Sequence, residues 1–188
     1  MRRFAPLPWA PSQLAFVLAL LLLAWTSRAV AEPQVHAGLA MGAVARDLGE
    51  GGPRFGFHGG VRVDALLFRA RGRQVGVGPY LDVVTSAFRS VEPGGGAVVL
   101  LPVGDDLAAA LSAGAFVRWP DARPGLSSTL WFGYRGFNFH GAYNLANGLF
   151  LQGRAGLGGH QMDLVGGAQI DLAYLAMPFV FAFEAIRR

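Results

Sequence analysis

The sequence contains no cysteine, and all of its 16 basic residues are arginines because lysine is also absent. Disulfide bridges, thiolate metal sites, cysteine nucleophiles and lipid attachment through an N-terminal cysteine are therefore excluded for this chain. Charged residues make up only 15% of the sequence, whereas 53% of it is hydrophobic. This balance is typical neither of disordered segments nor of soluble enzymes, so the apolar surface must be covered by a core or by lipid.

Long apolar runs are missing except near the N-terminus, where residues 1–31 have the features of a cleaved signal peptide. Arg2 and Arg3 supply positive charge, residues 14–25 form an uncharged apolar run, and residues 29–31 give a small-x-small cleavage pattern. A membrane anchor is the alternative, but the run is shorter than the about 20 residues that a spanning helix needs. We therefore predict a signal peptide over residues 1–31 and one exported domain over residues 32–188.

The predicted mature chain has almost no net charge. Removal of residues 1–31 takes away three arginines and no acidic residue, which leaves 13 arginines against 12 acidic residues and a net charge of +1. Such a balance does not favour a nucleic-acid partner. Every apolar run after residue 31 is interrupted before it reaches 18 residues, so a helical inner-membrane protein is excluded.

Apolar and small or polar residues alternate with period two through most of the mature chain, which indicates β-strands. In the stretch 55–67, for example, Arg62 and Asp64 share one face, and the other face is free of charge. Short stretches such as 69–74, 91–96 and 120–125 have the composition of turns and favour hairpins. The predicted strands are residues 35–44, 55–67, 74–83, 97–103, 107–119, 126–135, 149–157 and 164–174, of which 97–103 alternates least.

Eight such strands predict an all-β fold, an antiparallel up-and-down β-barrel of the membrane type. In lipid every backbone polar group must be paired, and for strands this requires a closed sheet without edges. A soluble barrel with a ligand inside has the same periodicity with the faces reversed. The charges favour the membrane type because each strand has only one or two, all on one face, whereas soluble surfaces are roughly 25–35% charged.

The charged face is therefore predicted to line the inside of the barrel as a packed polar network. Opposite charges on this face are expected to neutralise one another rather than to line an anion-selective pore. Aromatic residues near strand ends, Trp119, Tyr134, Tyr143 and Tyr174, are expected to lie at the membrane interfaces. The predicted lumen network comprises Arg62, Asp64, Tyr80, Asp82, Arg118, Arg135, Gln152, Arg154, Gln169 and Asp171.

The tail, residues 176–188, fits a strand and a helix about equally well. Phe179, Phe181 and Phe183 alternate as in a strand, but the residues between them are also apolar, and Pro178 interrupts a hydrogen-bonded ladder. A short helix starting at Pro178 is the alternative, because proline is tolerated in a first helical turn. We expect the tail to extend the eighth strand.

The glycine-rich and aromatic texture of residues 78–83 (GPYLDV), 111–118 (LSAGAFVR) and 148–158 (GLFLQGRAGLG) resembles that of small outer-membrane β-barrel proteins of Gram-negative bacteria. Uncharacterised barrels of myxobacteria-like genomes are similar in the same way. The resemblance implies that outer-membrane lipid and the barrel assembly machinery are partners. Many such barrels end in an aromatic residue that the assembly machinery reads, whereas this sequence ends in Ile186, Arg187 and Arg188. A sorting signal would therefore have to be internal, at Phe181 or Phe183.

Catalytic and metal sites are weakly supported. A lipid-modifying hydrolase or acyltransferase needs a nucleophile, a base and an acid, but no GxSxG motif is present. His36 and His58 are too few for a metal site, which usually has three or four ligands. We predict no catalytic residue, no metal and no cofactor. The residues considered for catalysis are Ser86 and Asp163 with His58, His140 and His160.

The sequence thus predicts an outer-membrane barrel with a packed polar lumen and a structural or small-solute role. A soluble periplasmic ligand-binding barrel and a lipid-modifying outer-membrane enzyme are the alternatives.

Overall fold

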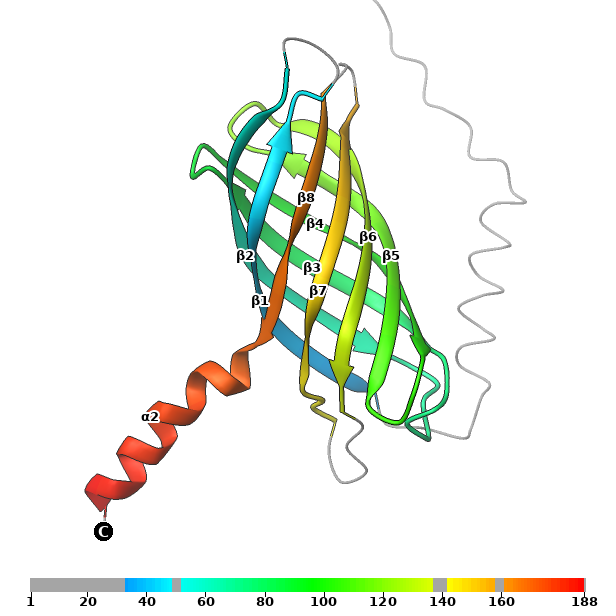
Figure 1. The fold of residues 1–188 in the computed structure, drawn as a ribbon, viewed down its shortest axis with the longest axis vertical. Coiled ribbons are helices and arrows are strands. Elements are labelled where there is room, and N and C mark those ends of the chain that lie inside the picture. Colours follow the sequence, from blue (N-terminus) through cyan, green and yellow to red (C-terminus); the bar gives the residue numbers. More distant parts are fainter. Residues whose placement is uncertain (1–32, 49–51, 137–141, 158–160, 188) are drawn as a thin grey trace, which may run out of the picture. The chain divides into compact units, whose positions relative to one another are not determined.

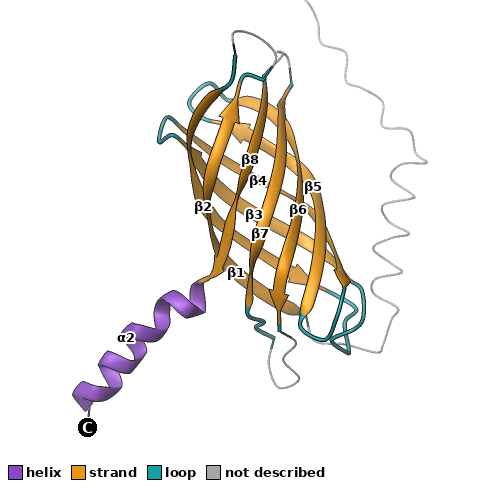
Figure 2. Ribbon diagram, viewed as in Figure 1, coloured by secondary structure: helices purple, strands orange, loops and turns teal. Residues whose placement is uncertain are grey.

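The computed structural model describes residues 33–48, 52–136, 142–157 and 161–187. The predicted signal peptide, His140 and His160 lie outside the described residues. The described chain folds into eight β-strands followed by one helix (Figures 1 and 2). They are β1 (Gln34–Arg46), β2 (Arg54–Leu66), β3 (Gly76–Ser86), β4 (Ser90–Pro102), β5 (Leu107–Arg118), β6 (Arg123–Arg135), β7 (Ala146–Gly156), β8 (Met162–Asp171) and α2 (Leu172–Arg187).

The strands form one closed barrel in which each strand pairs with the next along the chain, and β1 pairs with β8. All pairs are antiparallel. Figure 1 shows the strands inclined around a common axis, with the last strand beside the first. The predicted up-and-down barrel is confirmed, because pairing of β1 with β8 closes the sheet.

Alternation along each strand places polar side chains inside and apolar side chains outside. In β3, Tyr80 and Asp82 are buried, whereas the intervening Leu81 is 70% exposed and Val83 also faces outward. The same alternation continues through β5 and β6. Successive side chains of a strand point to opposite faces. The register of strand pairing therefore determines whether the polar or the apolar side chains are enclosed.

The barrel has two distinct ends. We call the end where β1 begins and β8 ends the terminal end; the hairpins after β2, β4 and β6 also lie there. The opposite end, with the hairpins after β1, β3, β5 and β7, is the far end.

The start of β4 differs from the prediction. Residues 91–96 were expected to form a turn, but β4 begins at Ser90 and includes all of them. The turn lies earlier, at Ala87 and Phe88, which both have positive φ angles, and Arg89 N–H donates to Ser86 O at 3.2 Å. Positive φ at both central positions is the geometry of a type I′ hairpin turn, which is usually occupied by asparagine and glycine.

The tail is a helix, so the expected extension of β8 is wrong. α2 begins at Leu172, and Pro178 lies inside it rather than at its start. The carboxylate of Asp171 accepts a hydrogen bond from Ala173 N–H at 2.7 Å and thereby caps the first turn. Among the described residues, no helix has the length and hydropathy needed to cross a membrane.

Small residues let the strands approach closely inside this narrow barrel. Gly42 of β1 is paired with Gly167 of β8, and Gly96 of β4 with Gly114 of β5. A Cβ added at Gly42 would overlap the backbone at Gly166, and one added at Gly96 would overlap Ala113 O. These positions therefore require glycine for packing rather than for backbone conformation.

Part of the interior is apolar. Leu100, Ala110, Trp131 and Phe150 are buried and lie in register across β4, β5, β6 and β7. They form one row of the core, against which the polar groups of the interior are packed.

Candidate functional site

The structure encloses the predicted lumen residues. All are buried except Arg62, which is half-buried. They are contributed by β2, β3, β5, β6, β7 and β8, so the network involves most of the barrel wall. Five of them belong to two groups of ion pairs and hydrogen bonds, together with residues that were not predicted to line the lumen. These five are Asp64, Arg118, Arg135, Arg154 and Asp171.

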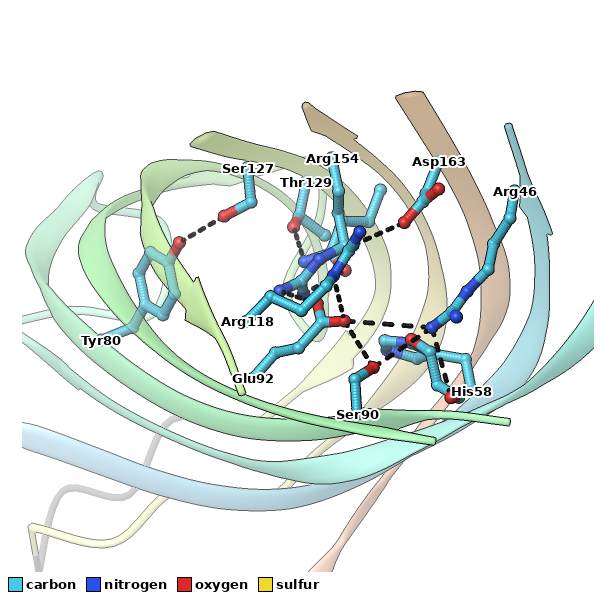
Figure 3. Close-up of polar contacts among 12 residues, drawn as sticks. Arg46, His58, Tyr80, Ser90, Glu92, Arg118, Ser127, Thr129, Arg154 and Asp163 are labelled. Carbon is cyan, nitrogen blue, oxygen red and sulfur yellow. Dashed lines mark hydrogen bonds and ion pairs between the residues drawn. The ribbon is translucent and has the colours of Figure 1, made fainter. Parts of the chain in front are cut away.

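The first group, which we call the glutamate cluster, is centred on Glu92 of β4 and comprises Arg46, Ser90, Glu92, Arg118, Arg154 and Asp163 (Figure 3). Glu92 is fully buried, and its carboxylate receives Arg118 Nε at 2.8 Å and Ser90 Oγ at 2.9 Å. Arg154 Nη2 lies 2.8 Å from the other carboxylate oxygen. Two guanidinium groups in direct contact therefore balance one enclosed carboxylate.

Several bonds of the glutamate cluster cross the barrel instead of following neighbouring strands. Arg154 of β7 meets Glu92 of β4, and Arg118 of β5 donates to Asp163 of β8 at 2.6 Å. Arg46 of β1 donates to Ser90 Oγ at 3.3 Å and lies 3.9 Å from Glu92. Because these strands are not paired with one another, the side chains occupy the lumen and connect its opposite walls.

The second group, the aspartate cluster, lies toward the terminal end and comprises His36, Asp64, Arg135, Tyr143 and Asp171. Arg135 of β6 donates to Asp64 of β2 at 2.6 Å across the barrel. His36 lies between two carboxylates, with Nδ1 3.1 Å from Asp64 and Nε2 3.6 Å from Asp171. This cluster therefore joins β1, β2, β6 and β8 from the inside.

Asp171 joins the aspartate cluster to the rim of the barrel. Its carboxylate accepts hydrogen bonds from Tyr143 O–H at 2.7 Å, Ala146 N–H at 3.0 Å and Ala173 N–H. Burial raises the pKa of Tyr143 to about 12, and the hydrogen bond to Asp171 acts in the same direction because it requires the neutral phenol. One carboxylate thus holds the loop before β7, the start of β7 and the start of α2.

Arg69, in the hairpin after β2, is buried at the terminal end. It donates to Gln34 Oε1 at 2.9 Å and to Gly72 O at 2.7 Å. Burial lowers the pKa of Arg69 to about 10, with the nearby charge of Arg135 contributing in the same direction.

The remaining predicted residues fill the space between these groups. The Arg62 guanidinium lies 3.9 Å from the centre of the Tyr80 ring, and Tyr80 O–H is 3.4 Å from Ser127 Oγ (Figure 3). Gln152 donates to Thr129 Oγ1 at 2.9 Å. Gln169 contacts His36 at 3.5 Å, and Asp82 is the register partner of Arg62 on the adjacent strand.

Sequence reasoning missed the central residue of the network, Glu92, because it assigned that residue to a turn. It also omitted Asp163 from the lumen, although Asp163 has the same parity in β8 as Gln169 and Asp171. The alternation in β8 could therefore have predicted that Asp163 faces the lumen. For Glu92 the signal appears only after β4 is extended back to Ser90, because Ser90 and Glu92 then alternate with outward residues.

Among the described residues, only part of the Ser–His–acid arrangement that catalysis needs is present. His58 Nδ1 and Ser86 Oγ are 3.4 Å apart, and both residues are buried. Asp163, the acid considered for this set, instead pairs with Arg118. A Ser–His pair requires a third group that orients the histidine, and Asp163 does not occupy that position.

The described residues contain no group of three or more histidine, cysteine, aspartate or glutamate side chains suited to a metal ion. His36 and His58 are not brought together: His36 belongs to the aspartate cluster, and His58 packs near Ser86 and Phe150.

Cavities beside the network are small. One lined by Arg62, Asp64 and Arg135 and another lined by Arg62, His58 and Gln152 have volumes of about 20 Å³ each. Such a space holds about one water molecule. A larger pocket of about 330 Å³ opens at the far end and is lined by Phe116, Arg118, Arg123, Pro124, Gly156, Leu157 and Gln161.

The outward face of the strands is apolar between the two ends of the barrel. Leu111, Leu130 and Leu151 lie in register across β5, β6 and β7, and each is about half exposed at 50–52%. Among the described strand residues, the exposed charged side chains belong to Arg54 and Arg123, each the first residue of its strand at the far end.

Exposed aromatic side chains gather near both ends. Phe57 and Phe88 stack at the far end with ring centres 5.2 Å apart. Of the predicted interfacial aromatics, Trp119 is exposed at the far end, and Tyr134, Tyr143 and Tyr174 are exposed at the terminal end. The outer wall therefore consists of an apolar middle between two aromatic margins.

Comparison with known proteins finds no matching family model, no matching curated protein and no matching solved structure.

Proposed function

We propose that this protein is an outer-membrane β-barrel whose interior is closed by ion pairs and which has a structural rather than a catalytic role. The apolar outer wall carries this proposal. A row of half-exposed leucines in the middle of the wall, with aromatic side chains toward both ends, matches what a lipid bilayer solvates. Soluble proteins rarely expose contiguous apolar patches larger than a few hundred Å². A wall of this kind is therefore better covered by lipid than by water.

The interior supports a closed barrel rather than a pore. The ion pairs Arg118–Asp163, Arg135–Asp64 and Arg154–Glu92 each connect strands on different sides of the lumen. An anion-selective pore needs unneutralised arginines along an open path, whereas these guanidinium groups contact carboxylates directly. We therefore expect no ion conduction by the folded barrel.

Two other functions are less well supported. A soluble periplasmic ligand-binding barrel encloses its ligand in an apolar or mixed cavity. Here charged side chains fill the interior, and the pocket of about 330 Å³ opens at the far end. A lipid-modifying enzyme needs an oriented Ser–His pair near the rim. Its best test remains the loss of altered lipopolysaccharide acylation in His140→Ala or His160→Ala variants.

Two measurements on the folded mature protein test the proposal. Its migration in detergent gels should depend on heating, as is typical of closed barrels, and planar bilayers containing it should show no discrete conductance steps. Steps of constant amplitude would overturn the closed-lumen assignment in favour of a pore. A protein that stays monomeric in solution without detergent would instead support the periplasmic alternative.

A further inference from the structure

The helix α2 exposes apolar side chains along most of its length. Leu175 and Met177 are exposed, and Phe179 and Phe183 are 77% and 64% exposed. Its described charged residues, Glu184 and Arg187, come only toward the end of the helix. Unlike the outward residues of the strands, which form one continuous wall, these side chains extend beyond the barrel and need a covering of their own.

We propose that α2 lies in the membrane interface at the terminal end of the barrel, with its phenylalanines among lipid acyl chains and Arg187 among anionic headgroups. This inference rests on the proposed function, because it requires the barrel wall to be embedded in lipid. It adds a second lipid-contacting surface that the closed sheet does not require.

The junction with β8 places the start of the helix at the rim of the barrel. α2 begins directly after Asp171, and the Asp171 carboxylate holds Ala173 N–H, Ala146 N–H and Tyr143 O–H together. Tyr134 and Tyr143 are exposed at this same end of the wall. Tyrosines of membrane proteins favour the bilayer interface, so the first turn of α2 starts at the depth where these rings lie.

The length and composition of α2 suit a helix that lies in the interface. Its 16 residues span about 24 Å at 1.5 Å per residue, less than the roughly 30 Å of a hydrocarbon core. The apolar residues come first and the charges last, so the helix can follow the acyl boundary while its end reaches the headgroups. Glu184 and Arg187 need a polar surrounding, which the headgroup region supplies and a purely apolar protein partner does not.

The absence of cysteine allows a direct test, because any introduced thiol is the only one in the chain. Single variants Phe179→Cys and Phe183→Cys report on α2. Leu130→Cys reports on the middle of the wall, and Arg73→Cys on a water-exposed hairpin at the same end as α2. Each full-length mature variant is labelled with an environment-sensitive fluorophore and folded into vesicles containing phosphatidylglycerol. Heat-dependent gel migration checks that each barrel is closed.

Quenchers on lipid acyl chains and soluble iodide then distinguish the outcomes. We expect lipid quenching at residues 179 and 183 to be at least half as strong as at residue 130, and iodide quenching to be several-fold weaker than at residue 73. Iodide quenching equal to that at residue 73, with residue 130 quenched by lipid, would overturn the helix placement and leave the membrane barrel intact. Residues 179 and 183 shielded from both quenchers would mean that a second copy covers α2, which also overturns it. No lipid quenching at residue 130 would refute the membrane barrel itself.

Discussion

At the scale of single residues, the most consequential side chain is the buried carboxylate of Glu92, because it contacts two arginines and lies near a third. Glu92→Gln keeps the shape but removes the negative charge, leaving Arg118 and Arg154 enclosed without their shared counterion. Removing one partner of a buried ion pair costs about 3–5 kcal/mol. We expect the free energy of unfolding, measured by denaturant titration in detergent micelles, to fall by about this amount.

The matched control for Glu92→Gln is Asp105→Asn. Asp105 forms an ion pair with Arg73 at 2.6 Å, but both side chains are about three-quarters exposed. Exposed pairs are screened by solvent, so this variant should unfold at the wild-type denaturant concentration. Equal behaviour of the two variants would show that the glutamate cluster does not stabilise the barrel.

Asp171 is expected to act locally rather than on the whole barrel. Asp171→Ala removes the acceptor for Ala146 N–H and Ala173 N–H, and the loss of a helix cap alone costs about 0.5–2 kcal/mol. Hydrogen exchange at these two amides should become faster, while amides in the middle of β3 to β6 keep their protection. Asp171→Asn retains a capping oxygen and should restore most of the protection at Ala173. Unchanged exchange in Asp171→Ala would contradict the assigned junction.

The ten predicted lumen residues could be placed from the sequence because each belongs to an alternating strand on which one parity carries the charge. Glu92 could not, because its part of β4 was assigned to a turn. The partners of the ten residues could not be predicted either. Arg135 meets Asp64 although 71 positions separate them in the chain. Such a pair depends on how the strands are inclined around the barrel, and alternation along one strand contains no information about that inclination.

At the scale of secondary-structure elements, the hairpin between β3 and β4 shows where turn chemistry misleads. Glycines usually mark turns, and residues 94–96 are glycines, but here they lie within β4. The turn uses Ala87 and Phe88 with positive φ angles instead. Gly96 is needed in the strand because Gly114 approaches it closely from β5, so packing rather than turn geometry explains its presence.

The glycine pairs lead to a prediction about closure of the barrel. Gly42→Ala places a methyl group against the backbone of β8 at Gly166 and Gly167. Overpacking of this kind typically costs about 1–3 kcal/mol. We expect a smaller fraction of the variant to show heat-modifiable migration after refolding. Gly153→Ala is the control because nothing lies within 4 Å of its added methyl group; a refolding defect of equal size there would refute the packing explanation.

The tail shows a limit of period-two reasoning. Its alternating phenylalanines predicted a strand, but a longer β8 would have to pair with β1 beyond Gly38. That edge is bonded to the loop before β7, because Val35 N–H donates to Ala142 O and Asn144 N–H donates to Val35 O. A helix satisfies its backbone hydrogen bonds internally, and the Asp171 cap provides its start. Whether the tail forms a strand or a helix therefore depends on the bonds of neighbouring segments, which the tail sequence alone does not reveal.

At the scale of the whole molecule, the number of strands and the closed topology followed from the sequence because alternation and turn spacing are repeated along the chain. The same alternation does not reveal whether lipid or water surrounds the barrel. The sequence pattern of a strand is identical whether its polar face points inward or outward. Here the uncharged face points outward, and this orientation is the basis for proposing a lipid environment.

A charge introduced on the middle of the wall tests this orientation. Leu130→Arg should reduce stability in a bilayer by about 2–4 kcal/mol, the cost of an arginine at the midplane on the lipid face of a barrel. The measurement is denaturant unfolding of the protein folded into vesicles, with Leu130→Met as the volume-conserving control. An arginine that is tolerated as well as methionine would mean that residue 130 faces water.

The most direct test of the membrane assignment is the location of the mature protein in a Gram-negative host that exports it. After cell breakage, we predict that the protein sediments with the outer membrane and stays there when alkaline carbonate removes peripheral proteins. Recovery of the folded protein in the soluble periplasmic fraction would contradict the membrane assignment.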